Sequence, residues 1–429
     1  IEKISIPCHV TEICEGAFYF CQKLMKIEIP SNSELKLIGN DAFVFSSIYT
    51  INIPPHCTRI GDNAFKNCNY LYKIEIPENS ELLSIGNYSF DSTSIKNLTI
   101  PSNISIIEKN TFGFCEKLQK IEIPSNSKIH TIESYAFYGS SIASISIPSS
   151  VIDMKESWCS RTEKLKEVIV DPNNPRYLSI DNKIIIGKTD ITNNFYDVLV
   201  FVSRDVESYV LPRDIKTIEN HAFENCVKLK KIEIPIDSEL ETIKDFAFSY
   251  SSIESISFPP HLITIGKCAF FSCHNLRHVE FSNKSELCLI DKLAFYRTPI
   301  EKISIPPHLK KIGERAFEEC VKLKEFEIPK NSELQTIDIY AFHESSIEKI
   351  LIPPSLVTIG RHAFEYCLKI KTIEIPVDSK STTIDSETFF NTKIESFLIP
   401  PQLKIICKYT FNNCFDLKKI EFPVNSKIK

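Results

Sequence analysis

One phenylalanine recurs along this chain at steps that alternate between 25 and 22 residues. It occupies positions Phe18, Phe43, Phe65, Phe90, Phe112 and Phe137, and then Phe223, Phe248, Phe270, Phe295, Phe317, Phe342, Phe364, Phe389 and Phe411. The repeating unit is therefore 47 residues long, as in residues 300–346, and has two unequal halves. A fixed period of about 20–50 residues is typical of a solenoid, whose units must stack because none buries its own apolar face. The period predicts one elongated repeat domain over residues 1–429.

Each half of the unit contains a short segment in which apolar and polar residues alternate before a proline. Examples are residues 26–29 before Pro30 and residues 50–53 before Pro54. The alternation predicts a strand whose isoleucines point inward, and proline ends the strand because it has no amide hydrogen to donate. We expect these strands to form one parallel sheet on the concave side of the solenoid.

The segment around the repeated Ala-Phe-x-x-Cys is too short for a full amphipathic helix. We expect it to form a helical or 3₁₀ turn on the convex side, which makes the predicted fold an α/β-type repeat solenoid. Six of the ten glycines lie four residues before the repeated Phe, at Gly39, Gly61, Gly86, Gly266, Gly313 and Gly360. This shared position predicts a turn with a positive φ.

The cysteines follow the same period. Eight of the 15 lie three residues after the repeated Phe, at Cys21, Cys68, Cys115, Cys226, Cys273, Cys320, Cys367 and Cys414. Ser or Thr takes this position in the alternate half-units. Successive thiols would lie two rungs apart, roughly 9–10 Å at about 4.8 Å per rung, which is too far for a disulfide. The sequence therefore predicts buried free thiols that pack as small apolar groups.

The period falters near the middle of the chain. Trp158 takes the position of the repeated Ala and Cys159 that of the repeated Phe. Between residues 171 and 212 the spacing of the strand-ending prolines rises from 23 or 24 residues to 40. Two apolar runs, 183–186 and 198–202, predict a β-hairpin inserted into one rung, and residues 208–211 restore the strand. We therefore expect a first repeat block at 1–170, the hairpin rung at 171–212 and a second block at 213–429.

Motifs for catalysis, phosphate binding or dinucleotide binding are absent from the sequence. The strongest candidate for a metal site is the group Cys268, Cys273, His274 and His278. The repeat register places Cys273 at a buried position and His278 at an outward strand position, so they should face different surroundings. The sequence therefore predicts no catalytic residue, no cofactor and no metal site.

The charges are balanced and interleaved, with 50 basic and 55 acidic residues. This pattern offers no basic face for nucleic acid and no polybasic anchor for a membrane. The sequence contains no run of 18 apolar residues and its first residues do not resemble a signal peptide. Because both ends fall within a repeat, we expect the parent protein to extend beyond them, so a cytoplasmic location stays open beside an extracellular one.

The outward residue in the middle of each strand is the best candidate for a binding function. It is Glu28, Glu75, Glu122, Glu233, Glu280, Glu327, Glu374 and Glu421 in one half of the units, and Ser, Asn or Thr in most of the others. Leu351 and Leu398 break the polar pattern. We therefore predict that a protein ligand binds Glu280, Glu327, Leu351, Glu374, Leu398 and Glu421. The alternative is a solvated β-surface that keeps like charges off adjacent rungs.

The pattern IP-x(4–6)-LxxIGxxAFxxCxxLxxI resembles the BspA-like, or treponemal-type, leucine-rich repeat over nearly the whole chain. The resemblance implies a right-handed superhelix and a non-enzymatic surface protein of the adhesion or antigen type, which binds host or extracellular-matrix proteins. Ser282, where other rungs have proline, and the rung of Trp158 depart from the pattern. A structural or self-assembling solenoid without a dedicated ligand is the alternative function.

Overall fold

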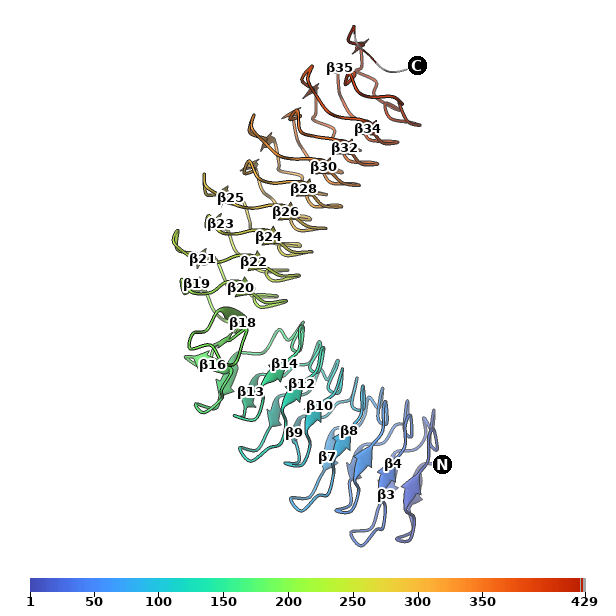
Figure 1. Cartoon of the computed structure of the whole chain (residues 1–429). Coiled ribbons are helices and arrows are strands. Elements are labelled where there is room, and N and C mark those ends of the chain that lie inside the picture. Colours follow the sequence, from blue (N-terminus) through green and yellow to red (C-terminus); the bar gives the residue numbers. More distant parts are fainter. Residues whose placement is uncertain (425, 427–429) are drawn as a thin grey trace. The chain divides into compact units, whose positions relative to one another are not determined.

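The computed structural model describes residues 1–424 and 426, which form stacks of short strands in two compact units (Figure 1). Unit 1 comprises residues 1–194 and 201–204, and unit 2 comprises residues 195–200 and those from 205 onward. In each unit, most strands of three or four residues stack in one parallel ladder, and two-residue strands stack in a second. In unit 2 each ladder is continuous, whereas in unit 1 the strand pairing is interrupted twice in the first ladder and once in the second. We call these the long-strand ladder and the short-strand ladder.

In unit 1 the long strands are β1 (Lys3–Ser5), β3 (Lys26–Glu28), β5 (Thr50–Asn52), β7 (Lys73–Glu75), β9 (Asn97–Thr99), β11 (Lys120–Glu122), β13 (Ser144–Ile147) and β15 (Glu167–Val170). The short strands are β2 (Glu12–Ile13), β4 (Leu37–Ile38), β6 (Arg59–Ile60), β8 (Ser84–Ile85), β10 (Ile106–Ile107), β12 (Thr131–Ile132) and β14 (Asp153–Met154).

In unit 2 the long strands are β19 (Ser208–Val210), β21 (Lys231–Glu233), β23 (Ser255–Phe258), β25 (His278–Phe281), β27 (Lys302–Ser304), β29 (Glu325–Glu327), β31 (Lys349–Leu351), β33 (Thr372–Glu374), β35 (Ser396–Leu398) and β36 (Lys419–Glu421). The short strands are β20 (Thr217–Ile218), β22 (Thr242–Ile243), β24 (Thr264–Ile265), β26 (Leu289–Ile290), β28 (Lys311–Ile312), β30 (Thr336–Ile337), β32 (Thr358–Ile359) and β34 (Thr383–Ile384).

The long strands form as the alternation of the sequence predicts. In β27 the residues pair in register with β29, Ile303 with Phe326 and Ser304 with Glu327, while Ile303 points into the core. The amide of Ile305, just after β27, donates to the carbonyl of Glu327 at 3.0 Å, and the equivalent bonds in other rungs are 2.8–2.9 Å long. Pro306 follows and ends the ladder, because it has no amide hydrogen to donate. The prediction of parallel strands that end at proline is confirmed.

The prediction of a single sheet is incomplete. The two-residue strands that follow the proline turn, such as β28 and β30, pair in parallel through Ile312 and Ile337. Both isoleucines are fully buried. The Leu-x-x-Ile part of each repeat therefore forms a second ladder, because its inward Ile needs the same stacked neighbours as the long strand.

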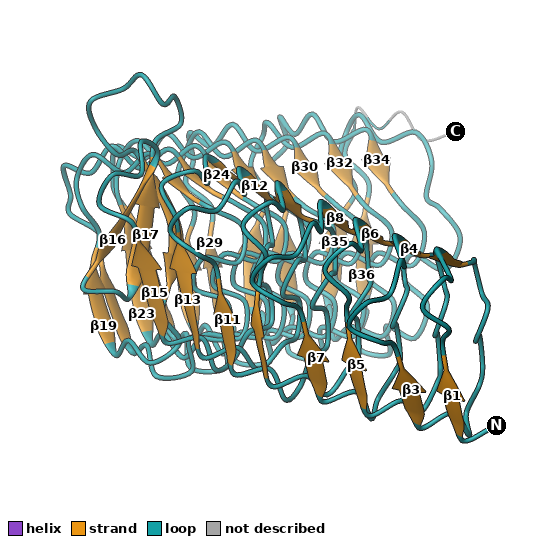
Figure 2. Ribbon diagram, turned by 90° about the horizontal axis from the view of Figure 1, so that it is seen from below, coloured by secondary structure: helices purple, strands orange, loops and turns teal. Residues whose placement is uncertain are grey.

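The predicted helical or 3₁₀ turn is wrong, since no helix forms among residues 1–424 and 426 (Figure 2). In a typical turn segment the amides of Arg315, Phe317 and Glu319 donate to carbonyls of the next rung, at 2.8–2.9 Å. The intervening amides of Ala316 and Glu318 close local turns to the residue three positions earlier. In a helix all these amides would donate to carbonyls within the segment. Here every second amide donates to the next rung instead, so a helix cannot form. Arg315 and Glu319 accordingly have positive φ values of 58° and 56°.

The reason given above for the shared glycine position is also wrong. Gly313 and its equivalents do not have a positive φ. A Cβ atom on Gly313 would instead lie 2.6 Å from the carbonyl carbon of Asp291 in the preceding rung, closer than any side chain tolerates. Glycine is required here because two backbones approach each other closely.

The repeated Phe residues form one continuous stack in each unit. Their ring centroids are 5.1–5.8 Å apart from Phe18 to Phe137 and 4.5–5.8 Å apart from Phe223 to Phe411. Trp158 continues the stack of unit 1, with its ring edge-on to Phe137 at 6.2 Å and packed against Phe201 at 6.0 Å. The ring of Trp158 therefore fills the place in the stack that the repeated Phe fills in other rungs, although Trp158 stands one residue before that position in the repeat.

All 15 cysteines are free thiols in the structure, as predicted for the eight of the ladder. Six of these eight, Cys68, Cys115, Cys226, Cys273, Cys320 and Cys367, are buried. The Cys320 thiol donates to the carbonyl of Phe295 at 3.1 Å and lies 3.4 Å from the Thr298 hydroxyl. Burial raises the pKa of the Cys320 thiol, and of Cys367, to about 12. A Ser or Thr hydroxyl of the preceding half-unit lies 3.3–3.4 Å from six of the eight ladder thiols and so serves as their partner.

The two runs predicted in the insert are neighbouring strands of one sheet, and a third strand that was not predicted lies beside the first of them. This third strand, β16 (Tyr177–Ile180), pairs in antiparallel with β17 (Ile184–Gly187). Asp181 and Asn182 both adopt positive φ in the short turn that joins β16 to β17.

The second predicted run, β18 (Val198–Val202), lies next to β17 in the sheet, and the amide of Ser203 that follows it donates to the carbonyl of Lys183 at 2.7 Å. On its other side β18 pairs in parallel with β20 through Val198 and Leu199. The strand predicted at residues 208–211 is confirmed as β19.

The Phe stack generates a prediction for stability. Phe317→Ala should lower the free energy of unfolding by about 3–5 kcal/mol, because the fully buried ring contacts two stacked neighbours and its removal leaves a cavity. Chemical denaturation measures this loss. A loss below about 1 kcal/mol would contradict an interior position for the ring.

The thiol ladder predicts a dependence of stability on pH. Burial raises the thiol pKa in the folded state above its ordinary value of 9.0, so the thiols stabilise the fold fully below about pH 9 and progressively less as pH rises toward 12. The double variant Cys320→Ala, Cys367→Ala should show a shallower fall in unfolding free energy above pH 9, by at most about 1.4 kcal/mol per pH unit for each thiol.

A thiol titration provides the companion measurement. Without reductant, denatured protein should yield close to 15 thiols, whereas the native protein should react first at the exposed Cys8 and Cys14. A yield of eight or fewer from denatured protein would contradict the free-thiol ladder.

Candidate binding surface

The outward side chains of the long-strand ladder of unit 2 form a single row, which we call the outer row. It consists of Glu280, Ser304, Glu327, Leu351, Glu374, Leu398 and Glu421, from β25 to β36. Ser304 lies directly opposite Glu327, Leu351 opposite Glu374, and Leu398 opposite Glu421. The structure therefore brings all six residues predicted from the sequence onto one face of unit 2.

The glutamates of this row are paired with lysines. Lys302 Nζ lies 2.6 Å from Glu327 Oε1, and Lys349 Nζ lies 2.5 Å from Glu374 Oε1. Glu327 raises the pKa of Lys302 above its ordinary value, and Glu325, 2.9 Å away, adds to the effect. The outer row is thus a mixed-charge surface and not an acidic one. Lys302 and Lys349 each stand at the first position of the long strand that precedes the strand of their glutamate, a position where lysine recurs along the sequence.

Unit 1 shows the same arrangement at its first two strands. Lys26 and Lys3 each place Nζ 2.8 Å from Glu28 Oε1, and the Ser5 hydroxyl donates to Glu28 Oε2 at 2.9 Å. Lys26 chiefly, with Lys3 and Ser5, lowers the pKa of Glu28 to about 2. Such exposed pairs contribute little to stability, so they define the charge pattern of the face and do not hold the fold together.

Leu351 and Leu398 are the two apolar members of the outer row. Leu351 is 36% exposed and lies between the rungs of Glu327 and Glu374. Leu398 is half-buried beside Glu421. Leu351 therefore offers a partner an apolar contact between ion pairs, whereas the equivalent residues of earlier rungs, Ser257 and Ser304, are polar.

A shallow hollow borders the start of the row. Glu280 and Phe281 of β25 line it together with Lys302 of β27 and the following Pro306. Ser282, which replaces the usual proline, is also part of its wall. The hollow and Leu351 therefore lie along the same ladder.

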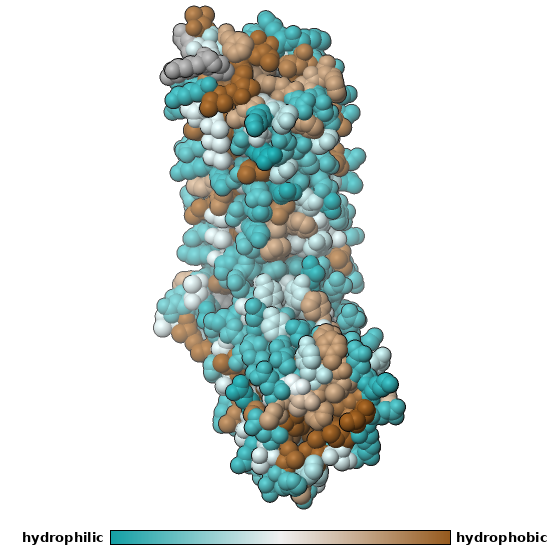
Figure 3. All heavy atoms as spheres, turned by 90° about the vertical axis from the view of Figure 1, so that its right-hand side faces the viewer, coloured by the Kyte–Doolittle hydropathy of each residue, from teal (hydrophilic) through white to brown (hydrophobic). Residues whose placement is uncertain are grey.

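Exposed apolar residues also occur away from the outer row. On the face seen in Figure 3, hydrophilic residues predominate along the rungs, and apolar residues gather near the C-terminal end and again in the lower part of the view. Ile405, Tyr409 and Phe415 are among the most exposed large apolar residues of the chain. Exposure alone therefore does not distinguish Leu351, whose distinguishing feature is its place in a row of ion pairs.

The cysteine and histidine group considered for a metal in the sequence lies in two environments. Cys268 and Cys273 are buried, whereas His274 and His278 are exposed. A different group, which was not predicted, consists of His362, Glu365 and Glu387, whose ligand atoms all lie within 4.8 Å of one another. The repeat register could have revealed it, because His362 and Glu387 occupy the same position in successive rungs.

A family model described as "BspA type leucine-rich repeat region (6 copies)" matches residues 1–96, 83–195, 197–320 and 288–418. The chain belongs to this family. The match confirms the resemblance seen in the sequence and is consistent with the parallel ladders of both units. No catalytic family is indicated.

Three solved bacterial proteins share the fold. A leucine-rich cell surface protein from Faecalibacterium prausnitzii is 20% identical with a TM-score of 0.54, covering 98% of this chain and 88% of its own. A leucine-rich repeat protein from Eubacterium ventriosum is 22% identical with a TM-score of 0.58, and the match covers 80% of this chain and 83% of that protein. The pneumococcal vaccine antigen PcpA is 21% identical with a TM-score of 0.59, and the match covers 95% of this chain and 84% of PcpA.

A comparison with curated proteins finds no match. In the part of the chain that the structure describes, no helix has the length and apolar character needed to cross a bilayer.

Proposed function

We propose that this chain is a non-enzymatic protein-binding module, of the cell-surface adhesion or antigen type, that holds a host or extracellular-matrix protein on the outer row of unit 2. The observation that carries the proposal is Leu351, an exposed apolar side chain in a row of Lys–Glu ion pairs. Interfaces concentrate their binding energy in apolar anchors surrounded by polar groups. A cell-surface or extracellular location is supported by the bacterial surface proteins with the same fold.

The mixed charge of the row bears on the kind of partner. A lysine lies within reach of Glu327, Glu374 and Glu421, so the face offers both signs of charge on several rungs. Such a surface is suited to a protein with its own alternating charges, and not to a polyanion such as nucleic acid. Leucine-rich repeat solenoids commonly use an extended ladder face in this way.

The binding site is tested by the double variant Leu351→Ser, Leu398→Ser. The probes are purified extracellular-matrix proteins, fibronectin and laminin among them, captured on a biosensor surface. A partner that wild-type protein binds should bind the double variant at least about tenfold more weakly, because the apolar anchor is lost. Leu368→Ser is the matched control, since Leu368 is exposed outside the row, and it should bind normally.

Charge reversal provides a second test of the same face. Glu327→Lys with Glu374→Lys should leave folding intact, because both side chains are about half exposed, at 51%. Binding of the partner should weaken at low salt, and the difference should shrink above about 0.15 M, where the screening length is roughly 8 Å.

Two results would count against the proposal. Unchanged binding by the leucine variant would place the site elsewhere, for example on the insert at residues 177–202. Light scattering that finds ordered oligomers, together with no capture of any matrix protein, would favour the structural or self-assembling scaffold.

A further inference from the structure

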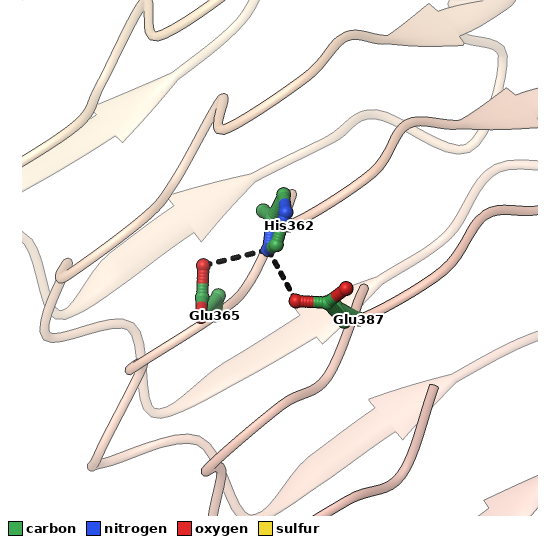
Figure 4. Close-up of side chains that lie close together, drawn as sticks. All are labelled: His362, Glu365 and Glu387. Carbon is green, nitrogen blue, oxygen red and sulfur yellow. Dashed lines mark ion pairs between the residues drawn. The ribbon is translucent and has the colours of Figure 1, made fainter. Parts of the chain in front are cut away.

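We infer that His362, Glu365 and Glu387 form a binding site for a divalent cation of the zinc class. The three side chains come from two successive turn segments of unit 2 and converge on one point (Figure 4). His362 Nδ1 lies 2.7 Å from Glu365 Oε2 and 3.5 Å from Glu387 Oε2. The inference does not depend on the outer row.

The imidazole of His362 provides the first argument. His362 is only 6% exposed, and within the described chain its Nδ1 atom has no partner in hydrogen-bond geometry despite the nearby carboxylates. A buried polar atom without a hydrogen bond costs free energy. A cation between Nδ1 and the two carboxylates would remove this cost.

The spacing of the three ligand atoms provides the second argument. Zinc bonds to imidazole nitrogen and carboxylate oxygen are about 2.0–2.2 Å long, so tetrahedral ligand atoms lie about 3.4 Å apart. The distances of 2.7 and 3.5 Å from His362 Nδ1 bracket this value. One imidazole and two carboxylates are a donor set that zinc accepts, and a fourth position would be left for water.

Neighbouring side chains hold the three ligands in place. The ring of Tyr340 stacks on His362 at 4.5 Å and 5°, which fixes the orientation of the imidazole. Arg361 Nη2 donates to Glu387 Oε1 at 3.0 Å, which leaves Oε2 directed at His362. His343 Nε2 lies 3.6 Å from Glu365 Oε2. Groups that orient the ligands in this way are typical of metal sites.

The repeat supplies an internal comparison. His221 and Glu224 occupy the same two positions in another rung of unit 2, with Nδ1 3.1 Å from Glu224 Oε2. In the rung that follows, Phe246 stacks on His221 at 5.0 Å where Glu387 would lie. The third ligand is therefore present in the rung of His362 and replaced by an aromatic ring in the rung of His221.

The competing explanation is a protonated His362 that pairs with both carboxylates and binds no ion. Both explanations account for the closeness of the three groups. They differ in whether added zinc binds, and in what each substitution does to that binding.

Calorimetric titration with zinc on the full chain separates the two explanations. The protein is first treated with a chelator, and its exposed thiols such as Cys8 and Cys14 are alkylated under native conditions, because thiolates also bind zinc. Wild-type protein should then show one zinc site that Glu387→Gln and His362→Gln each weaken at least about tenfold. Zinc should also raise the thermal midpoint of wild-type protein and not that of either variant.

His221→Gln is the matched control and should bind zinc as the wild type does. Glu387→Gln preserves the size of the side chain and decides the question even if His362→Gln fails to fold. Absence of zinc binding to the wild type would overturn the inference, as would a Glu387→Gln variant that binds zinc with unchanged affinity.

Discussion

Hydrogen bonds between successive rungs set the spacing of this chain, and most of its other features follow from that spacing. Successive rungs are bonded through the long strand, the short strand and the turn segment, as between β27 and β29 and between β28 and β30. Stacked rings then lie about 5 Å apart, and a Cβ on Gly313 would collide with the preceding backbone. A rung isolated from its neighbours would lose these bonds and expose its apolar interior, which is why the architecture is cooperative along its length.

The sequence predicted what depends on the period alone. The register of the Phe stack, the free thiols and the strands that end at proline all follow from equal spacing. The turn segment could not be predicted in this way, because a helix and the observed turns need the same short stretch with the same small residues. They differ in whether Phe317 and its neighbours bond within the segment or to the next rung. That choice depends on the neighbour, which no local pattern describes.

The surface shows the same limit. The sequence placed Glu327, Leu351 and Glu374 in one row correctly, since residues at equal repeat positions must stack. Which lysine pairs with which glutamate could not be predicted, because Lys302 belongs to the long strand before that of Glu327 and only the three-dimensional register brings the two together. The His362 group arises in the same way from positions 25 residues apart. In a solenoid, a site is thus assembled from repeat positions and not from a local motif.

The account can be tested most directly by native-state hydrogen exchange at the turn segments. If the turns are bonded between rungs, the amides of Arg315, Phe317 and Glu319 should exchange as slowly as strand amides such as that of Ile305, through unfolding of the stack. The intervening amides of Ala316 and Glu318, which close only local turns, should exchange faster. Rapid exchange at Phe317 while Ile305 stays protected would contradict the claim that the turn segments hold the rungs together.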